Sequence, residues 1–256
     1  MSLARLALRI ATVKALRGHT WAGDMVRDSE IGPIDDAAQD KEIPFVVVYT
    51  DDSEGEVSGT DLFAHDGKQC LVIEVGVTTR MKPGRSGPGG WAIPTTDAGM
   101  EMTIDAIERQ IKLALTDPAN PWGEFWRKLV LSIDMRKSQR GAAAKDGVRF
   151  AGRQIVLDVD LPRDPAPGRP LGPIWADFLA LCAADADLAG QVDALRALAT
   201  GGSTNWPDWQ SVRAAYGLSL DRARALQIAP PEGAPAAFTS ISVTSTPGVA
   251  DIGVPP

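Results

Sequence analysis

The residue types that most often form catalytic or metal sites are scarce in this sequence. It contains two histidines, His19 and His65, and two cysteines, Cys70 and Cys182. Their spacing matches none of the HxxxH, HxH, CxxC or HExxH patterns, so the sequence offers no zinc ligand set. Each cysteine lies in an apolar run, which is typical of a buried thiol and not of a nucleophile paired with His65. We therefore expect no catalytic residue, no metal and no cofactor.

A glycine-rich segment, residues 82–90, follows an apolar stretch and invites comparison with phosphate-binding loops. It contains two prolines, and it lacks both the GKS or GKT ending and the GxGxxG spacing that leads into a helix. We interpret residues 81–96 as a long exposed loop. Its Lys82 and Arg85 could meet an acidic partner.

Carboxylates leave one enzymatic alternative open. Asp61 or Asp66 precedes Glu74 in the manner of a magnesium-dependent nuclease, but Gly76 occupies the position where such enzymes place a lysine. Without that lysine the group that activates water is missing, although Mg²⁺ alone could help. A nuclease built on Asp61, Asp66 and Glu74, or an unrecognised hydrolase, remains the enzyme hypothesis.

Three apolar, β-branched stretches predict strands: residues 44–50, 69–79 and 148–161. The alternation in 69–79 places Leu71, Ile73, Val75 and Val77 on one face and Cys70, Val72, Glu74 and Gly76 on the other. In 148–161, Asp158 and Asp160 are two apart and share a face. This pattern favours a solvated sheet face, with an acid–base pair or a cation site as the alternative.

Helical periodicity predicts the elements that pack against these strands. Apolar residues recur at three- and four-residue spacing in residues 2–17, from Met100 to Leu115, and after Pro121, where Ile133 is expected to face inward. Residues 51–58 and 136–147 are expected to be loops, and residues 19–42 a long connection. A Pro/Gly linker at 162–173 precedes an Ala/Leu-rich helical region.

These elements predict an α/β (α+β) protein: a small mixed sheet of about four strands flanked by helices, with an additional C-terminal helical lobe. The expected divisions are an α/β core domain at 1–161, a helical lobe at 162–229 and a Pro/Gly-rich arm at 230–256. Within the arm, Phe238, Ile241 and Val243 suggest a short strand that joins a sheet edge or is lent to a neighbouring molecule.

The charge and composition of the chain disfavour some classes of binding partner. The net charge is −7 and no block of Lys or Arg occurs, which argues against sequence-specific nucleic-acid binding and against anionic membranes. No apolar run is long enough for a membrane span, no signal peptide is evident, and two cysteines indicate a reducing compartment. An acidic surface would not retain DNA that passes along the protein, although a requirement for solubility would explain the negative charge too.

Protein contacts are the function that the sequence indicates best. Trp21 and Trp91 fall in expected loops, where an aromatic side chain is a frequent interface anchor. Charged residues of segments 51–58 and 81–96 and apolar residues of the C-terminal arm are further candidates for such contacts. The candidate interface residues are Trp21, Asp51, Asp52, Glu54, Lys82, Arg85, Trp91, Phe238 and Ile241.

The order of elements resembles a known family. An amphipathic helix at 4–16 leads to the segment Gly23-Asp24-Met25-Val26-Arg27-Asp28, and a proline then opens the strand Pro44-Phe45-Val46-Val47-Val48-Tyr49. A hairpin and a central helix follow. This arrangement, over roughly residues 4–160, resembles the tail terminator, or tail completion, proteins of long-tailed bacteriophages and prophages.

The resemblance implies a structural virion protein without catalysis. Such proteins form a hexameric ring on the last ring of tail tube protein, stop tube polymerisation and present the docking surface for the head connector or neck protein. It also implies a place in the virion neck after assembly in the bacterial cytoplasm. This chain departs from the compact members by its length and by the helical region after Pro162. A bacterial adaptor or scaffold unrelated to phage is the third hypothesis.

Overall fold

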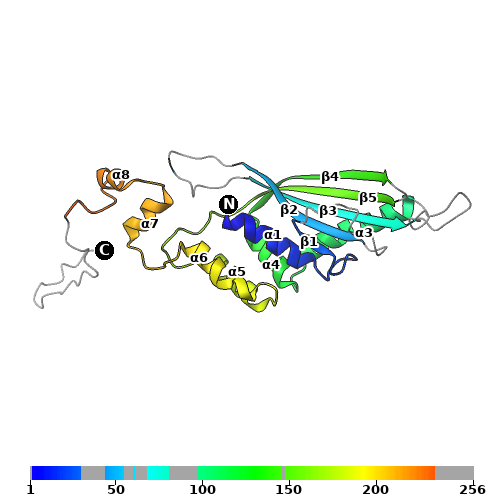
Figure 1. The fold of residues 1–256 in the computed structure, drawn as a ribbon, viewed down its shortest axis with the longest axis horizontal. Helices are drawn as coiled ribbons and strands as arrows, with labels where there is room; N and C mark the ends of the chain where they lie inside the picture. Colours follow the sequence, from blue (N-terminus) through cyan, green and yellow to red (C-terminus); the bar gives the residue numbers. More distant parts are fainter. Residues whose placement is uncertain are drawn as a thin grey trace, which may run out of the picture.

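A computed structural model of the chain describes residues 2–29, 44–54, 60, 68–80, 97–145 and 148–233. The protein is a mixed α/β structure in which a five-stranded sheet is flanked by helices, as the sequence predicts. Figure 1 shows the helical layer on one side of the sheet, with the C-terminal helices extending away along the long axis of the molecule.

The sheet is antiparallel except at one edge. Its strand order is β1-β2-β3-β5-β4, so β3 is central and β4 forms the long edge. Among the strands that the structure describes, only the β1–β2 pair is parallel. The strands are β1 (Val26–Asp28), β2 (Phe45–Glu54), β3 (Lys68–Arg80), β4 (Ser132–Lys145) and β5 (Val148–Asp160).

The alternation predicted for β3 is confirmed. Its side chains at 71, 73, 75 and 77 are buried under helices, and Cys70 and Glu74 on the other face are only partly covered, although Val72 between them is buried as well. In β5 the odd-numbered residues from Ile155 to Val159 are buried likewise, whereas Asp158 and Asp160 share the less buried face. A single apolar layer therefore joins the sheet to the helices.

Three helices form that layer: α1 (Leu3–Leu16), α3 (Asp97–Thr116) and α4 (Pro121–Leu129). The stripe from Met100 to Leu115 in α3 is buried, as its spacing predicts. Asn120 joins the three helices. Its side-chain oxygen accepts hydrogen bonds from the first turn of α4, and its amide nitrogen donates to the carbonyls of Ala15 (2.9 Å) and Ala114 (3.3 Å).

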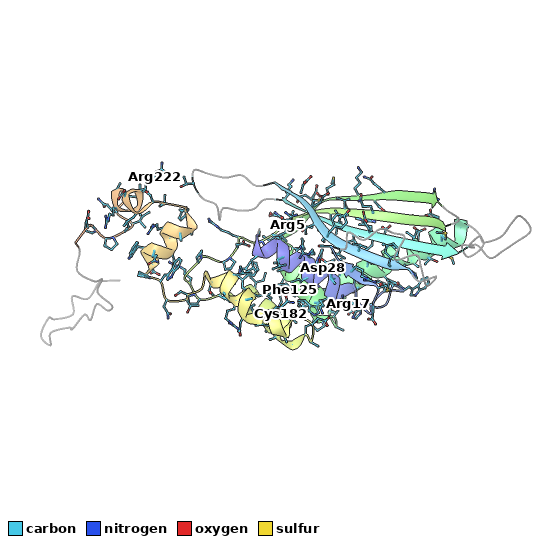
Figure 2. The ribbon with its side chains drawn as sticks, viewed as in Figure 1. Arg5, Arg17, Asp28, Phe125, Cys182 and Arg222 are labelled. Carbon is cyan, nitrogen blue, oxygen red and sulfur yellow. The ribbon has the colours of Figure 1, made fainter. Side chains whose placement is uncertain are left out.

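The helices after the linker begin with two that extend the same core. The Phe178 ring of α5 stacks on Phe125 of α4 at 5.5 Å between ring centroids, and Lys14 of α1 contacts Asp185 at 2.6 Å. Figure 2 shows Phe125 and Cys182 inside this helical layer. The remaining elements are α5 (Pro173–Ala184), a 3-10 turn (Ala189–Gln191), α6 (Val192–Thr200), α7 (Asp208–Ala215) and α8 (Leu220–Ala225).

The structure corrects several expectations about the elements. Residues 136–147 were expected to be a loop, but most of them belong to β4. The strand expected at 44–50 continues to Glu54, so Asp51 and Asp52 lie on β2 and not in a loop. The expected long connection after residue 18 contains β1, and Ile133, expected to face inward, is an exposed residue of β4.

Candidate assembly interface

The most exposed regular element of the sheet is the edge strand β4. It pairs only with β5, and every residue from 131 to 141 is exposed to solvent. In the part of the chain that the structure describes, no strand lies on its outer side. An edge strand presents a row of main-chain donors and acceptors that another strand can use.

Three large apolar side chains, one just before β4 and two within its first residues, 132–135, are also exposed. Leu131, Ile133 and Met135 are 60%, 50% and 42% accessible. A register shift between Ile133 and Met135 sets Ile133 opposite the buried Val159 and Met135 opposite Asp158, so the cluster reaches both faces of the edge. Strand β4 carries charges (Asp134, Arg136, Lys137 and Arg140) and a bulge, which are features that keep many sheet edges single. These features still leave the apolar edge cluster (Leu131, Ile133 and Met135) exposed, and apolar side chains that are exposed together often mark a contact with a partner.

Ion pairs hold the remainder of β4 in place. Arg136 and Arg140 of β4 contact Glu108 and Glu101 of α3. Arg153 of β5 contacts Glu101 at 3.0 Å and Glu108 at 3.2 Å. Helix α3 therefore contacts the edge of the sheet through ion pairs, because the strand positions that face it there carry arginines instead of apolar side chains.

Glu108 is the most enclosed acid of this network, with 7% of its surface exposed. Burial acts to raise its pKa, but hydrogen bonds from Lys112 and Arg153 outweigh burial, so the pKa of the Glu108 carboxyl lies below its usual value. Burial acts to lower the pKa of Arg153, but its hydrogen bonds to Glu108 and Asp105 outweigh burial, so this pKa lies above its usual value. Both groups are charged in the folded protein, and the network is structural.

The face of the sheet away from the helices carries a polar cluster. The Tyr49 hydroxyl donates to Glu74 Oε1 at 2.8 Å, and Gln154 Nε2 donates to the same oxygen at 2.9 Å. Partial burial, followed by the hydrogen bond to Glu74, raises the pKa of Tyr49 to about 12. Glu74 is thus hydrogen-bonded by its neighbours on β2 and β5.

The nuclease hypothesis gains no support from this arrangement. Position 76, where a lysine would be needed, is a glycine, and Asp61 and Asp66 lie outside the described residues. Among the described residues, no group of three or more His, Cys, Asp or Glu side chains could hold a metal ion. Likewise, no helix in the described ranges is long and apolar enough to cross a membrane.

Two regions of the candidate interface predicted from sequence are described and exposed. Trp21 is 57% accessible in the turn after α1, and its backbone N–H donates to Gln110 Oε1 of α3 at 2.8 Å. Asp51 and Asp52 are exposed on β2. Arg5 of α1 fixes this part of β2 by donating to Thr50 Oγ1 and to the Thr50 carbonyl, both at 2.8 Å.

Of the other predicted interface residues, only Glu54 lies in the described part of the chain. Glu54 ends β2, and Lys82, Arg85, Trp91, Phe238 and Ile241 lie outside the described residues. Trp21 and the Asp51–Asp52 pair occupy different elements, the turn after α1 and strand β2. The sequence interpretation missed the β4 edge, and the only signal for it was the run of alternating apolar residues from Leu131 to Met135.

The fold and the exposed edge define an α/β protein with a helix-backed sheet and a long edge strand that, in the described part of the chain, has a partner strand on one side alone. Comparison with models of known protein families and with curated protein sequences finds no match. The family resemblance therefore rests on the residues of segments 4–16, 23–28 and 44–49 and on the order of elements that follows them.

Proposed function

We propose that this chain is a non-catalytic structural subunit that assembles into a ring at the head-proximal end of a phage tail. In that role it would end polymerisation of the tail tube and join the tail to the head connector. The observation that carries the proposal is the edge of β4, where a long row of main-chain groups and the apolar edge cluster face solvent. Assembly through this edge would cover both.

The architecture is compatible with a closed ring. The two edges of the sheet differ in length, since β1 has three residues and β4 has fourteen. A contact between unlike surfaces of identical subunits is heterologous, and it closes into a ring when the rotation between neighbours divides a full turn. The net charge of −7 would keep DNA from adhering to such a ring.

The first test is the solution mass of the full chain by light scattering over a range of concentrations. We expect a mass near six subunits, or a concentration-dependent rise towards it, together with binding to the ends of assembled tail tubes. A monomer at every concentration that also fails to bind tail tubes would contradict the proposal. A stable dimer that ignores tail tubes would instead favour the bacterial adaptor or scaffold.

A pair of matched variants links the mass to β4. Ile133→Asp should lower the assembled mass, because it places a charge in the apolar edge cluster. Leu198→Asp should leave the mass unchanged, since Leu198 is equally apolar and 65% exposed, but lies on α6. Circular dichroism of both variants checks that the fold is retained. Equal masses for the two variants would place the contact elsewhere.

A further inference from the structure

We propose that residues 236–246 of a second copy of this chain add to the outer edge of β4 as a sixth strand. The inference rests on the proposed function, since it names the contact that would join neighbouring subunits. Strand addition of this kind gains affinity from main-chain hydrogen bonds and specificity from alternate side chains.

The receiving surface is the stretch from 131 to 141. Its residues are all exposed, and the ion pairs from Arg136 and Arg140 to α3 hold it in an extended, supported conformation. Leu131 and Ile133 are two residues apart, so they face the same side of the edge. An incoming strand would need apolar residues at the same spacing to cover them.

The sequence of 236–246 meets that requirement. Ile241 and Val243 are two residues apart, and the segment is otherwise composed of small, hydroxyl-bearing and aromatic residues that suit a strand. It lies between Pro235 and Pro247, and its length matches that of the exposed stretch of β4. No charged residue occurs between Glu232 and Asp251 in a chain of which 23% is charged, so the segment opposes no charge to the basic edge.

The other strands that this chain could offer to β4 fit less well. Pairing of β4 with a second β4 would bring Arg136, Lys137 and Arg140 close to the same residues of its partner, and like charges on neighbouring strands are destabilising. The opposite edge, β1, has only three residues, and its Asp28 is engaged by Arg9 at 2.6 Å. The uncharged C-terminal segment avoids both problems.

Exchange between subunits follows from the position of α8. Figure 1 shows α7 and α8 at one end of the long axis, whereas β4 lies towards the other end. The described chain stops at Gly233, shortly after α8. A segment that departs from that end is placed to reach a neighbouring subunit, and repetition of the same contact around a ring would leave no subunit without a partner.

The test uses full-length chains that carry Cys70→Ser and one new cysteine each. The buried Cys182 can stay, because burial raises the pKa of its thiol to about 11 and keeps it unreactive. Chains with Gln139→Cys are mixed with chains that carry a cysteine at one position from 239 to 244, and the mixed disulfides are quantified by mass spectrometry. Gln191→Cys, exposed in the 3-10 turn, replaces Gln139→Cys as the control.

Strand addition predicts mixed disulfides whose yield alternates several-fold between successive arm positions, because alternate side chains face the same side as residue 139. The control should give only a low, even yield. A synthetic peptide of residues 236–246 should also lower the mass of the assembled full-length protein, whereas the same peptide with N-methyl groups at 239, 241 and 243 should not.

Three results would overturn the inference: a yield that does not alternate, a disulfide that forms only within one chain when both cysteines are present in it, or a peptide without effect on the mass. A six-subunit mass with any of these results would leave the ring standing and the arm exchange wrong. A full-length chain that neither assembles nor binds tail tubes would refute the proposed function itself.

Discussion

Tyr49 is one of only two tyrosines, which makes its ionisation easy to follow by ultraviolet absorbance. With a pKa of about 12, its contribution to stability is fully present below pH 10, the ordinary pKa, and is lost as the pH rises through 12. Tyr49→Phe should remove the late phase of the absorbance titration. Glu74→Gln should move that phase to lower pH, because it removes the negative charge beside the phenol; an unmoved phase would contradict the assigned hydrogen bond.

Glu108 gives the opposite pH dependence. Because its folded-state pKa lies below the ordinary 4.5, its contribution is fully present above pH 4.5 and is lost as the pH falls through the folded-state value. In the Glu108→Gln variant the free energy of unfolding, measured by urea denaturation at a series of pH values, should therefore fall less steeply below pH 4.5 than in the wild type. Asp193→Asn on α6 is the matched control. Arg153→Ala should lower the free energy of unfolding at pH 7 by about 1.5–3 kcal/mol, since hydrogen bonds to charged groups contribute that much.

Among the elements, α1 depends on a residue from the linker. The Asp164 carboxylate accepts hydrogen bonds from the Ser2 hydroxyl (2.9 Å) and from the N–H groups of Leu3 (2.9 Å) and Ala4 (2.8 Å). Asp164→Ala should destabilise the protein by about 1–2 kcal/mol, as loss of a helix cap does. Asp164→Asn, which keeps one acceptor oxygen, should cost less. Urea unfolding of both variants tests the order.

Local sequence predicts the buried elements better than the exposed ones. The alternation in β3 and the helical stripe of α3 were predicted correctly, because a face buried along its whole length leaves a strict periodic record in the sequence. Strand β4 was missed because residues 136–144 contain no β-branched or aromatic residue. Its extended conformation depends on pairing with β5 and on ion pairs with α3, which are contacts between distant parts of the chain.

The candidate interface shows the same division. Trp21, Asp51 and Asp52 are exposed, but Asp51 and Asp52 lie on a strand and not in the loop that their acidic segment predicted. Ile133 was expected to be buried because the apolar spacing after Pro121 continues past the end of α4 at Leu129. When apolar spacing of helical type runs on from a helix into an edge strand, as it does here, the spacing alone predicts burial for strand residues that are exposed.

At the scale of the whole molecule, the structure predicts unequal protection along the chain. Helix α5 shares the core with α1 and α4, whereas α7 is joined to the linker by contacts such as those of Arg163 to the Ala215 carbonyl (3.4 Å) and of Arg169 to Asp208 (3.2 Å). Amides of α5 should exchange only on global unfolding, and those of α7 and α8 should exchange earlier, through local opening. Hydrogen exchange with mass spectrometry measures both; equal protection would place α7 and α8 in the same cooperative unit as the core.

The link between Asp164 and Ser2 joins residues 162 positions apart. A ribosome that adds about 5–20 residues per second needs about 10–30 s to pass from one to the other. During that interval α1 has left the ribosome without its cap and without the acidic turn at Asp185 that binds Lys14. Helix α1 is thus synthesised well before the residues that cap and anchor it. The apolar face of α1 stays uncovered at least until α3 and α4 have been synthesised, and a chaperone would act on it in that interval.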